Sequence, residues 1–212
     1  MFNYNKSLAI ILCAAGQSAR LGQAKQLLPI AEQTLLTWQL SKFVKLKLPI
    51  YVVLGAASEE LHKEIARSHL NQQHLHLLTN PNWQLGLGSS IAYGIKSLPT
   101  SIDGALLLFV DQYLLTTELL TAFITTWQAQ AQSILLASAK NIQGPPVIFP
   151  KAYFAELAAL TEQSGAKAII KKHQHNTVFF NLPEAFTDID TPEDLSAFDY
   201  FKSQLQLTSK LQ

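Results

Sequence analysis

Short apolar runs alternate with amphipathic stretches along this chain. The apolar runs have the length and aliphatic content of buried strands, and they cover residues 8–13, 50–54, 75–78, 103–110 and 133–139. Between them, apolar side chains recur at helical spacing in residues 34–44, 58–70, 90–98 and 116–130. Ser58, and either Ser89 or Ser90, are suitable N-caps for two of these helices. This alternation predicts a mostly parallel sheet with right-handed crossovers and helices on its faces.

The region after residue 140 has a less regular pattern. Residues 143–150 read QGPPVIFP, which is too rich in proline for a central strand, so we expect an edge strand or a lid over the ligand crevice. Helices are expected over 153–160 and within 161–173, and a late strand over 178–181. Thr191 as N-cap, Pro192 at the first helical position and acidic residues in the first turn then predict a last helix.

The first strand leads into an unusual loop. The small side chains of Ala14, Ala15 and Gly16 leave the backbone uncovered, and Ser18 adds a hydroxyl group. Arg20 and Lys25 add two positive charges to the same loop. Exposed amide groups and nearby cations both stabilise concentrated negative charge, so this combination predicts a polyphosphate-binding loop. The alternative is a strand-to-helix turn with ordinary surface cations. The spacing fits neither the Walker loop nor the dinucleotide-binding fingerprint.

Two acidic positions indicate a site for a hard cation. Asp111 ends the most apolar strand, where a carboxylate is costly unless it is paired, and a divalent cation is a natural partner. Asp188 and Asp190 lie two residues apart and project to the same side if the segment is extended. The alternative for both residues is an elaborated helix cap.

Composition narrows the class of protein. The chain has 212 residues, 48% of them hydrophobic and 15% charged, so we expect one domain over residues 1–212 with a sizeable core. A net charge of +1 gives no general attraction to nucleic acid or to an acidic membrane. The N-terminus lacks the pattern of a secretory signal, and no apolar run is long enough to span a bilayer. We therefore expect a soluble cytoplasmic protein.

Cysteine and histidine offer weaker candidates. The single cysteine, Cys13, lies inside the first predicted strand without an adjacent base, so we expect it to pack in the core rather than to act as a nucleophile. No cysteine or carboxylate completes a tetrahedral set with the histidines, which makes a zinc site a poor hypothesis. The six histidines are His62, His69, His74, His76, His173 and His175.

The loop carries a family signature. The segment AAGQSARLGQAKQLLP closely resembles AAGxSxRxGxxKxLLP, the opening motif of the nucleotidyltransferases of the molybdenum cofactor type. Its AAG form is more similar to the cytidylyltransferases of that group than to the guanylyltransferases. The resemblance implies a three-layer α/β/α, Rossmann-like fold of the nucleotide-diphospho-sugar transferase type. It implies catalytic roles for Arg20, Lys25 and Asp111. It also implies a magnesium site on Asp111 and Asp190, with Asp188 as the substitute for Asp190.

Four further segments resemble motifs of the same family. Residues 80–94, NPNWQLGLGSSIAYG, resemble a nucleotide-contacting element. Residues 186–198 contain DIDTPEDL, which is similar to the segment that ends the family's catalytic domain. Residues 143–149 and 161–167 resemble the elements that hold the second substrate. The nucleotide-binding residues that the resemblance implies are Ala14, Ala15, Gly16, Gln17, Ser18, Lys25, Asn80, Gly86 and Ser90. The acceptor-binding residues that it implies are Gly144, Pro146 and Lys167.

The chain departs from the family pattern at five positions. Val110 and Tyr113 replace the glycine and proline of a GDxP motif, which puts the loop geometry around Asp111 in question and narrows the nucleotide site. On the acceptor side, Glu162 and Gln163 stand in place of a GD pair. Lys167 replaces an arginine, so a point charge replaces a bidentate fork.

The resemblance implies a specific reaction. With Mg²⁺ as cofactor, CMP would be transferred from CTP to a molybdopterin-type cofactor with release of pyrophosphate, and a molybdoenzyme would receive the product. Positioning and charge neutralisation would supply most of the rate, because no nucleophile set is recognisable. Two alternatives stay open: a nucleotidyltransferase acting on another phosphorylated or sugar-like acceptor, and a non-catalytic protein that binds nucleotide or cofactor.

Overall fold

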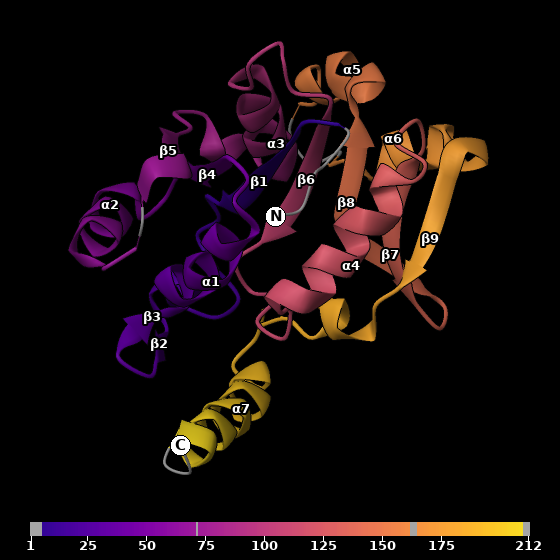
Figure 1. The fold of residues 1–212 in the computed structure, drawn as a ribbon. Helices are drawn as coiled ribbons and strands as arrows, with labels where there is room; N and C mark the ends of the chain where they lie inside the picture. The colour runs from indigo at the N-terminus through magenta and orange to yellow at the C-terminus, as the bar shows by residue number, and fades with distance from the viewer. Residues whose placement is uncertain (1–5, 71, 162–164, 210–212) are drawn as a thin grey trace.

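A seven-stranded sheet runs through the centre of the protein (Figure 1). The computed structural model describes residues 6–70, 72–161 and 165–209. The sheet order is β5-β4-β1-β6-β8-β7-β9. Its strands are β1 (Leu8–Ala14), β4 (Ile50–Leu54), β5 (Leu75–Thr79), β6 (Gly104–Phe109), β7 (Ile134–Ala139), β8 (Ile142–Pro150) and β9 (Thr177–Asn181). A separate small hairpin consists of β2 (Pro29–Ile30) and β3 (Gln33–Thr34).

The sheet is mostly parallel, as the sequence predicts. Strands β5, β4, β1 and β6 pair in parallel, and β9 pairs in parallel with β7. Strand β8 is antiparallel to both of its neighbours, β6 and β7. The carboxyl ends of β1 and β6, which are direct neighbours, therefore open toward the same edge of the sheet, where open α/β sheets bind their ligands.

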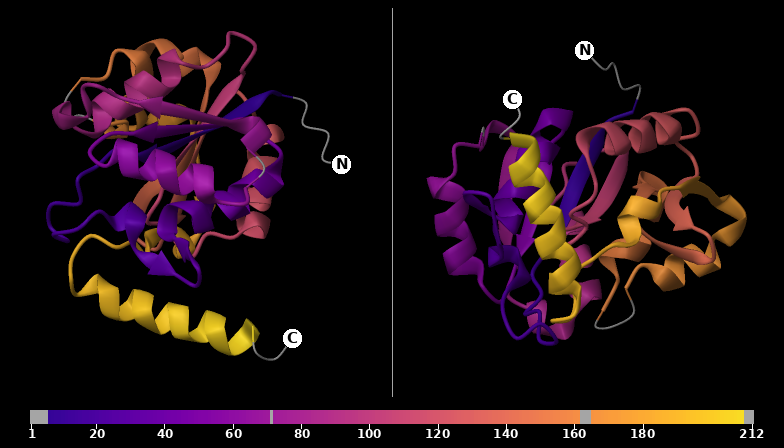
Figure 2. Two further views of the ribbon diagram at one scale, coloured as in Figure 1. Left: turned by 90° about the vertical axis from the view of Figure 1, so that its left-hand side faces the viewer. Right: turned by 90° about the horizontal axis from the view of Figure 1, so that it is seen from below.

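Helices cover both faces of the sheet, which confirms the three-layer α/β/α architecture (Figures 1 and 2). One face is covered by α1 (Leu35–Phe43), α2 (Ser58–Arg67), α4 (Thr117–Gln128) and α7 (Asp194–Ser209). The other is covered by α3 (Leu87–Lys96), α5 (Phe154–Ala158) and α6 (Lys167–Lys172). Short 3-10 helices lie at Lys25–Leu27, Val44–Leu46, Gln72–His74, Trp83–Leu85, Lys151–Tyr153, Gln174–Asn176 and Pro183–Phe186.

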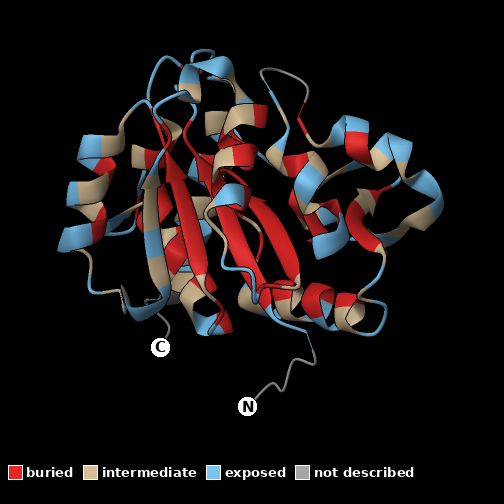
Figure 3. Ribbon diagram, turned by 90° about the horizontal axis from the view of Figure 1, so that it is seen from above, coloured by how far each residue is buried: buried red, intermediate tan, exposed pale blue. Residues whose placement is uncertain are grey.

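The period of two along the strands divides the core between the faces. In β1, Leu8, Ile10 and Leu12 pack toward α1 and α4, whereas Ile11 and Cys13 pack toward α3. Figure 3 shows the central strands as almost continuously buried. Strands buried on both faces read as uninterrupted apolar runs, which is why their bounds were predictable to within one residue at most ends.

The edge-strand or lid prediction for residues 143–150 is wrong, because β8 lies inside the sheet between β6 and β7. Its prolines are tolerated by their positions in the ladder. The register with β7 shifts between Gly144 and Val147, so Pro145 and Pro146 fall in the interruption. The pairing with β6 covers only Val147 to Pro150. The two prolines therefore cost the sheet no ladder hydrogen bond.

Two predicted helix starts differ from the structure. Ser58 is the first residue of α2 and makes no cap, and α2 ends at Arg67 rather than near residue 70. Helix α3 begins at Leu87, after Gly86 with φ of 104°, so Ser89 and Ser90 lie inside its first turn. These differences arise because backbone turns set where a helix begins when several capping residues compete nearby.

At the start of the last helix, Thr191 donates hydrogen bonds to Asp194, whereas the prediction has Thr191 as an acceptor. The carboxylate of Asp194 accepts hydrogen bonds from the backbone N–H groups of Asp190 and Thr191 and from the Thr191 hydroxyl group, at 2.8 to 3.0 Å. Thr191 is thus a donor to the first helical residue rather than an N-cap acceptor. These bonds lower the pKa of Asp194 and fix the turn that carries Asp190.

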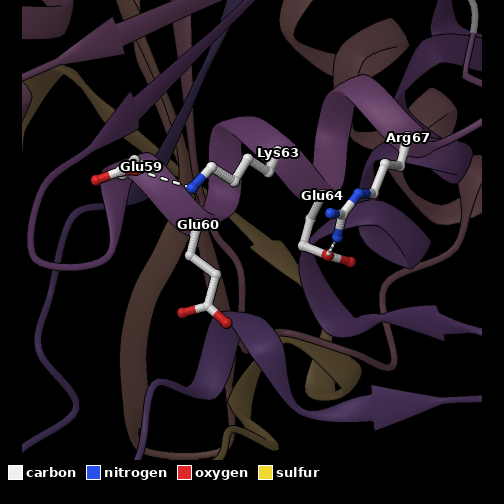
Figure 4. Close-up of a pocket in the computed structure, with 5 residues that line it drawn as sticks. All are labelled: Glu59, Glu60, Lys63, Glu64 and Arg67. Atoms are coloured by element: carbon white, nitrogen blue, oxygen red, sulfur yellow. Dashed lines mark hydrogen bonds and ion pairs between the residues drawn. The ribbon is translucent and has the colours of Figure 1, made fainter.

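A hollow on the outer surface of α2 is lined by charged residues of this one helix (Figure 4). Lys63 pairs with Glu59 at 2.8 Å, and Arg67 pairs with Glu64 at 3.3 Å. Such exposed pairs within a helix contribute about 0.2–0.5 kcal/mol each. Because their charges are satisfied locally, we assign this hollow no binding role.

None of the helices in the described ranges is long and apolar enough to cross a membrane.

Lys42 lies on α1, and its side chain contacts the loop that follows β6. Its Nζ donates hydrogen bonds to the carbonyl groups of Tyr113 at 3.1 Å and Leu115 at 2.6 Å, and lies 3.7 Å from the centre of the Trp38 ring. Burial lowers the pKa of Lys42 from 10.5 to about 7. The carbonyl and ring contacts favour the ammonium form and offset part of this cost.

This pKa predicts a pH-dependent contribution to stability. Between pH 7 and 10.5 the unfolded chain keeps a proton at Lys42 that the folded chain releases, so the free energy of unfolding rises with pH across this window. Relative to Lys42→Met, the wild type should gain about 3 kcal/mol from pH 7 to pH 10, measured by urea unfolding. A wild-type minus variant difference that stays constant with pH would contradict this.

Candidate active site

Three charged side chains from distant segments meet at the carboxyl edge of the sheet. Lys25 Nζ lies 2.5 Å from Asp111 Oδ2 and 2.7 Å from Asp190 Oδ1. Lys25 begins a 3-10 helix in the loop after β1, Asp111 follows β6, and Asp190 precedes α7. The structure therefore brings together three of the residues that the sequence singles out.

Burial differs across this cluster. The side chains of Lys25 and Asp111 are 15% and 11% exposed, whereas Asp190 is 41% exposed. Arg20 lies at the rim, with its side chain 77% exposed and its Nη1 atom 3.6 Å from Asp190 Oδ2. A solvated pair of this kind contributes little to stability, so Arg20 is free to turn toward an anion in the site.

The electrostatics of the cluster favour cations. Burial opposes the charge of Lys25, but the adjacent Asp111 and Asp190 carboxylates outweigh it and raise the Lys25 pKa, so the side chain stays protonated. The pKa of Asp188 is raised by desolvation and by the negative charges of Asp111 and Asp190. Three carboxylates thus act on one another around a single buried ammonium group.

The donor set fits a metal ion that is shared with a substrate. Within the described ranges, no group of three or more histidine, cysteine or acidic side chains is arranged to hold a metal by itself. Magnesium commonly uses one or two carboxylates and takes its other ligands from water and substrate phosphates. Asp111 and Asp190, bridged by one ammonium group, supply carboxylate oxygens of this kind.

A cavity of about 350 Å³ lies beside the charged cluster. This volume falls in the range of small-molecule sites. Its walls come from the loop after β1, the start of α3 and the end of β6, and the lining residues are Cys13, Ala14, Ala15, Gly16, Gln17, Lys25, Gln26, Trp83, Gln84, Gly86, Leu87, Ser90, Phe109, Val110 and Asp111. Most of the predicted nucleotide-binding residues thus line one cavity together with Lys25 and Asp111.

Two predicted nucleotide-binding residues, Asn80 and Ser18, are not among the residues that line the cavity. Asn80 is 1% exposed; its side-chain amide donates to the hydroxyl groups of Ser89 and Ser90 at 3.1 and 3.2 Å, and its Oδ1 accepts the Asn82 N–H. The Ser18 hydroxyl group accepts the backbone N–H of Lys25 at 3.2 Å. In this structure both side chains hold the loops on which other candidate residues lie.

Gln26 is a site residue that the sequence reasoning missed. It is 2% exposed, and its Nε2 donates to the carbonyl groups of Ala14 at 2.7 Å and Gly16 at 2.9 Å. These two bonds tie the loop after β1 to the 3-10 helix that carries Lys25. A single polar residue between Lys25 and the apolar run LLPI was the available signal.

Trp83 is a second lining residue that was not predicted as functional. A Cβ atom at Gly55 would lie 2.6 Å from Trp83 Cβ and 2.5 Å from the Ala15 carbonyl oxygen. Only glycine at this position lets the tryptophan approach the loop after β1. The cavity wall therefore depends on a glycine at the end of β4.

The predicted acceptor residues lie apart from the cavity lining. Gly144 and Pro146 belong to β8, where a Cβ atom on Gly144 would lie 3.4 Å from the Phe186 ring. Lys167 is exposed at the start of α6. The departures at Glu162 and Gln163 lie outside the described residues.

Val110 and Tyr113, which replace the glycine and proline of the family motif, lie in different surroundings. Val110 is 3% exposed and lines the cavity next to Asp111. Tyr113 is 2% exposed and packs away from the cavity against Phe198 and Phe201 of α7, with ring centres 5.1 and 5.0 Å apart. Tyr113 is therefore a core residue rather than a cavity residue.

Sequence comparison identifies a family and two relatives of this chain. A family model described as MobA-like NTP transferase domain matches residues 9–177. The chain is 26% identical over 184 residues to the molybdenum cofactor cytidylyltransferase of Escherichia coli K12, covering 87% of this chain and 91% of the relative. It is 25% identical over 191 residues to the purine catabolism protein PucB of Bacillus subtilis 168, covering 87% and 92%.

Structural comparison gives the same fold. The crystal structure of Rv0371c from Mycobacterium tuberculosis H37Rv in complex with manganese is similar with a TM-score of 0.72 and 20% identity. The similarity covers 91% of this chain and 97% of that protein. The two proteins thus share the mostly parallel sheet with helices on both faces.

Cys13 contributes to the cavity wall but is poorly suited to react. It is 7% exposed at the end of β1, and burial, with a further contribution from the Asp111 charge, raises its pKa from 9.0 to about 12. The thiolate is the reactive form of cysteine. This environment agrees with the predicted packing role.

The raised pKa predicts slow alkylation. At pH 8 the thiolate fraction of Cys13 should be about 1000-fold lower in the folded protein than in the unfolded chain, from the difference between 9.0 and about 12. Iodoacetamide labelling followed by mass spectrometry, with a sample in urea as control, measures this ratio. Equal labelling rates in the two samples would contradict the assignment.

Proposed function

This chain belongs to the MobA-like NTP transferase domain family, and on that premise we propose that it transfers CMP from CTP to a molybdopterin-type cofactor with release of pyrophosphate. The Escherichia coli relative, a molybdenum cofactor cytidylyltransferase, supports this choice of reaction. The observation that carries the proposal is the Lys25 ammonium group between Asp111 and Asp190, at the mouth of a cavity with an uncovered backbone loop. In this proposal a molybdoenzyme receives the product.

Nucleotide binding is assigned to the loop after β1 and the start of α3. The small residues Ala14 to Gly16 let the phosphates approach the backbone, while Gly86 and Ser90 form the opposite wall. Arg20 at the rim and Lys25 inside are placed to neutralise the phosphate charge. Trp83 and Phe109 add aromatic surface for the base.

The chemistry is a direct displacement at the α-phosphorus. An oxygen of the acceptor's terminal phosphate forms the new bond to the α-phosphorus, and the bond to the β-phosphate oxygen breaks to release pyrophosphate. Lys25 and Arg20 stabilise the negative charge that develops on the leaving pyrophosphate. Asp111 and Asp190 would hold Mg²⁺, which when bound neutralises phosphate charge and fixes the phosphates relative to the attacking group.

The acceptor would approach from the side of β8 and α6. Gly144, Pro146 and Lys167 are assigned there, and Gln112 connects this side to the candidate metal site. Its Nε2 donates to the carbonyl groups of Pro145 at 2.8 Å and Ala185 at 3.1 Å. A different acceptor is the second candidate, because the relative named for purine catabolism is almost as similar to this chain, at 25% identity.

The reaction predicts a specific pattern of pyrophosphate release. With Mg²⁺ and molybdopterin-type cofactor, CTP should be turned over faster than ATP, GTP or UTP in a coupled pyrophosphate assay. Lys25→Ala and Asp111→Asn should each lower kcat by about 100-fold or more, because each removes charge that acts on the transition state. Lys63→Ala, on the outer surface of α2, is the matched control and should behave as wild type.

Each outcome of this assay has a distinct meaning. Turnover with CTP and only another phosphorylated acceptor would replace the molybdopterin assignment with the second candidate. No turnover with any nucleotide and acceptor would favour a binding protein. Wild-type rates in both Lys25→Ala and Asp111→Asn would reject the assigned site.

The two late carboxylates can be separated by matched variants. Asp190 contacts Lys25, whereas Asp188 influences the cluster only through its charge, so Asp190→Asn should lower kcat by about 10–100-fold and raise the half-saturating Mg²⁺ concentration. Asp188→Asn should change both values less than threefold. Metal titrations of the two purified variants measure this, and the reverse order would assign the metal to Asp188.

A further inference from the structure

The loop that carries Asp111 has little regular structure of its own. It connects β6 to α4 over residues 110–116, and its internal backbone bonds are limited to N–H donors of Gln112, Tyr113 and Leu115. A carboxylate on such a loop is positioned only as well as the loop is held. Two side chains from α1, Gln39 and Lys42, bind backbone carbonyl groups of this loop.

Gln39 of α1 contacts the loop through its side-chain amide group. Its Nε2 donates to the carbonyl groups of Val110 at 3.2 Å and Gln112 at 2.9 Å, on either side of Asp111. The side chain is fully buried, at 0% exposed. One amide group therefore fixes the peptide units that flank the candidate metal ligand.

Lys42 continues this contact one helical turn later. Residues three apart on a helix lie on the same face, so Lys42 reaches the next part of the same loop. Its Nζ binds the carbonyl groups of Tyr113 and Leu115. Together the two side chains bind four carbonyl groups within six residues of the loop.

The burial of Gln39 is costly for the fold. Its neighbours on α1, Leu36, Leu40 and Phe43, are fully buried in the apolar core. Its Oε1 atom has no hydrogen-bond partner in the described part of the chain. A buried carbonyl oxygen without a partner destabilises a protein, and an apolar side chain of similar size would avoid this cost. A role for its amide N–H groups explains why a polar side chain stands at this position.

Aromatic residues of α7 pack against both α1 and the loop that carries Asp111. Trp38, below the Lys42 ammonium group, contacts the Phe201 ring edge-on at 5.6 Å, and Tyr113 of the loop packs against Phe198 and Phe201. Figure 2 shows α7 lying across this face of the molecule, outside α1. The loop is thus enclosed between α1 and α7.

We propose that Gln39 and Lys42 are positioning residues for Asp111, which they set against Lys25 and Asp190 by binding the carbonyl groups of its loop. The catalytic part of this inference rests on the proposed function, since it takes Asp111 as the metal-holding residue. The structural part, that these side chains restrain the loop, does not depend on the reaction.

Hydrogen exchange tests the structural part without any substrate. In full-length Gln39→Met, amide exchange in peptides covering residues 110–116 should be about tenfold faster than in the wild type, with no change in β1 and β4. Lys42→Met should do the same, whereas Lys42→Arg, which keeps a cationic donor, should restore slow exchange. Lys45→Met, at an exposed lysine just beyond α1, is the matched control.

Metal dependence of turnover tests the catalytic part. In Gln39→Met and Lys42→Met, kcat should fall about 10–100-fold and the half-saturating Mg²⁺ concentration should rise several-fold, with the KM for CTP within twofold of wild type. A loss of folded protein would lower kcat but would not move the metal dependence. Lys42→Arg should recover most of both values.

The outcomes separate the two parts. Folded Gln39→Met and Lys42→Met with wild-type loop exchange and metal dependence would overturn the inference. Failure of both variants to fold would also overturn it, because a stabilising role would then account for both residues. If the wild type turns over no nucleotide, the proposed function fails, and the exchange result alone decides whether the two side chains hold the loop.

Discussion

The Lys25 ammonium group between Asp111 and Asp190 is the interaction on which the site depends. Two carboxylates at the edge of an apolar sheet repel one another unless a cation lies between them. Lys25 supplies this charge at 2.5 and 2.7 Å and joins the loop after β1, the end of β6 and the turn before α7. Because these segments are far apart in the chain, the charged cluster forms only when the whole sheet has assembled.

Buried glutamines support the site where regular secondary structure ends. Gln26 ties the loop after β1 to the turn that carries Lys25, Gln39 holds the peptide units around Asp111, and Gln112 joins β6 to β8 and to the segment before Asp188. Each side-chain amide binds backbone carbonyl groups in loops, at the end of a strand or at the register shift in β8. Buried polar groups need such partners, so the loops gain order without becoming helix or strand.

Local patterns predicted the elements better than the places where segments meet. The strands at 8–13 and 50–54 followed from uninterrupted apolar runs, and Lys25, Asp111 and Asp190 followed from their residue types at strand ends and turns. The interior position of β8 could not be predicted from the sequence pattern, because the sheet accommodates Pro145 and Pro146 through a register shift with β7. Nor could sequence spacing indicate that Gln39 and Gln112 reach across to carbonyl groups of other segments.

The replacement of the family's proline by Tyr113 is explained by packing on the side away from the cavity. A proline restrains a loop through its own backbone, whereas Tyr113 restrains it through a ring buried against Phe198 and Phe201. Helix α7 begins four residues after Asp190, so this aromatic contact links the loop of one carboxylate to the segment of the other. The separation of Asp111 and Asp190 is thereby set by the core between β6 and α7. A loop sequence can change there while the two carboxylates keep their common cation.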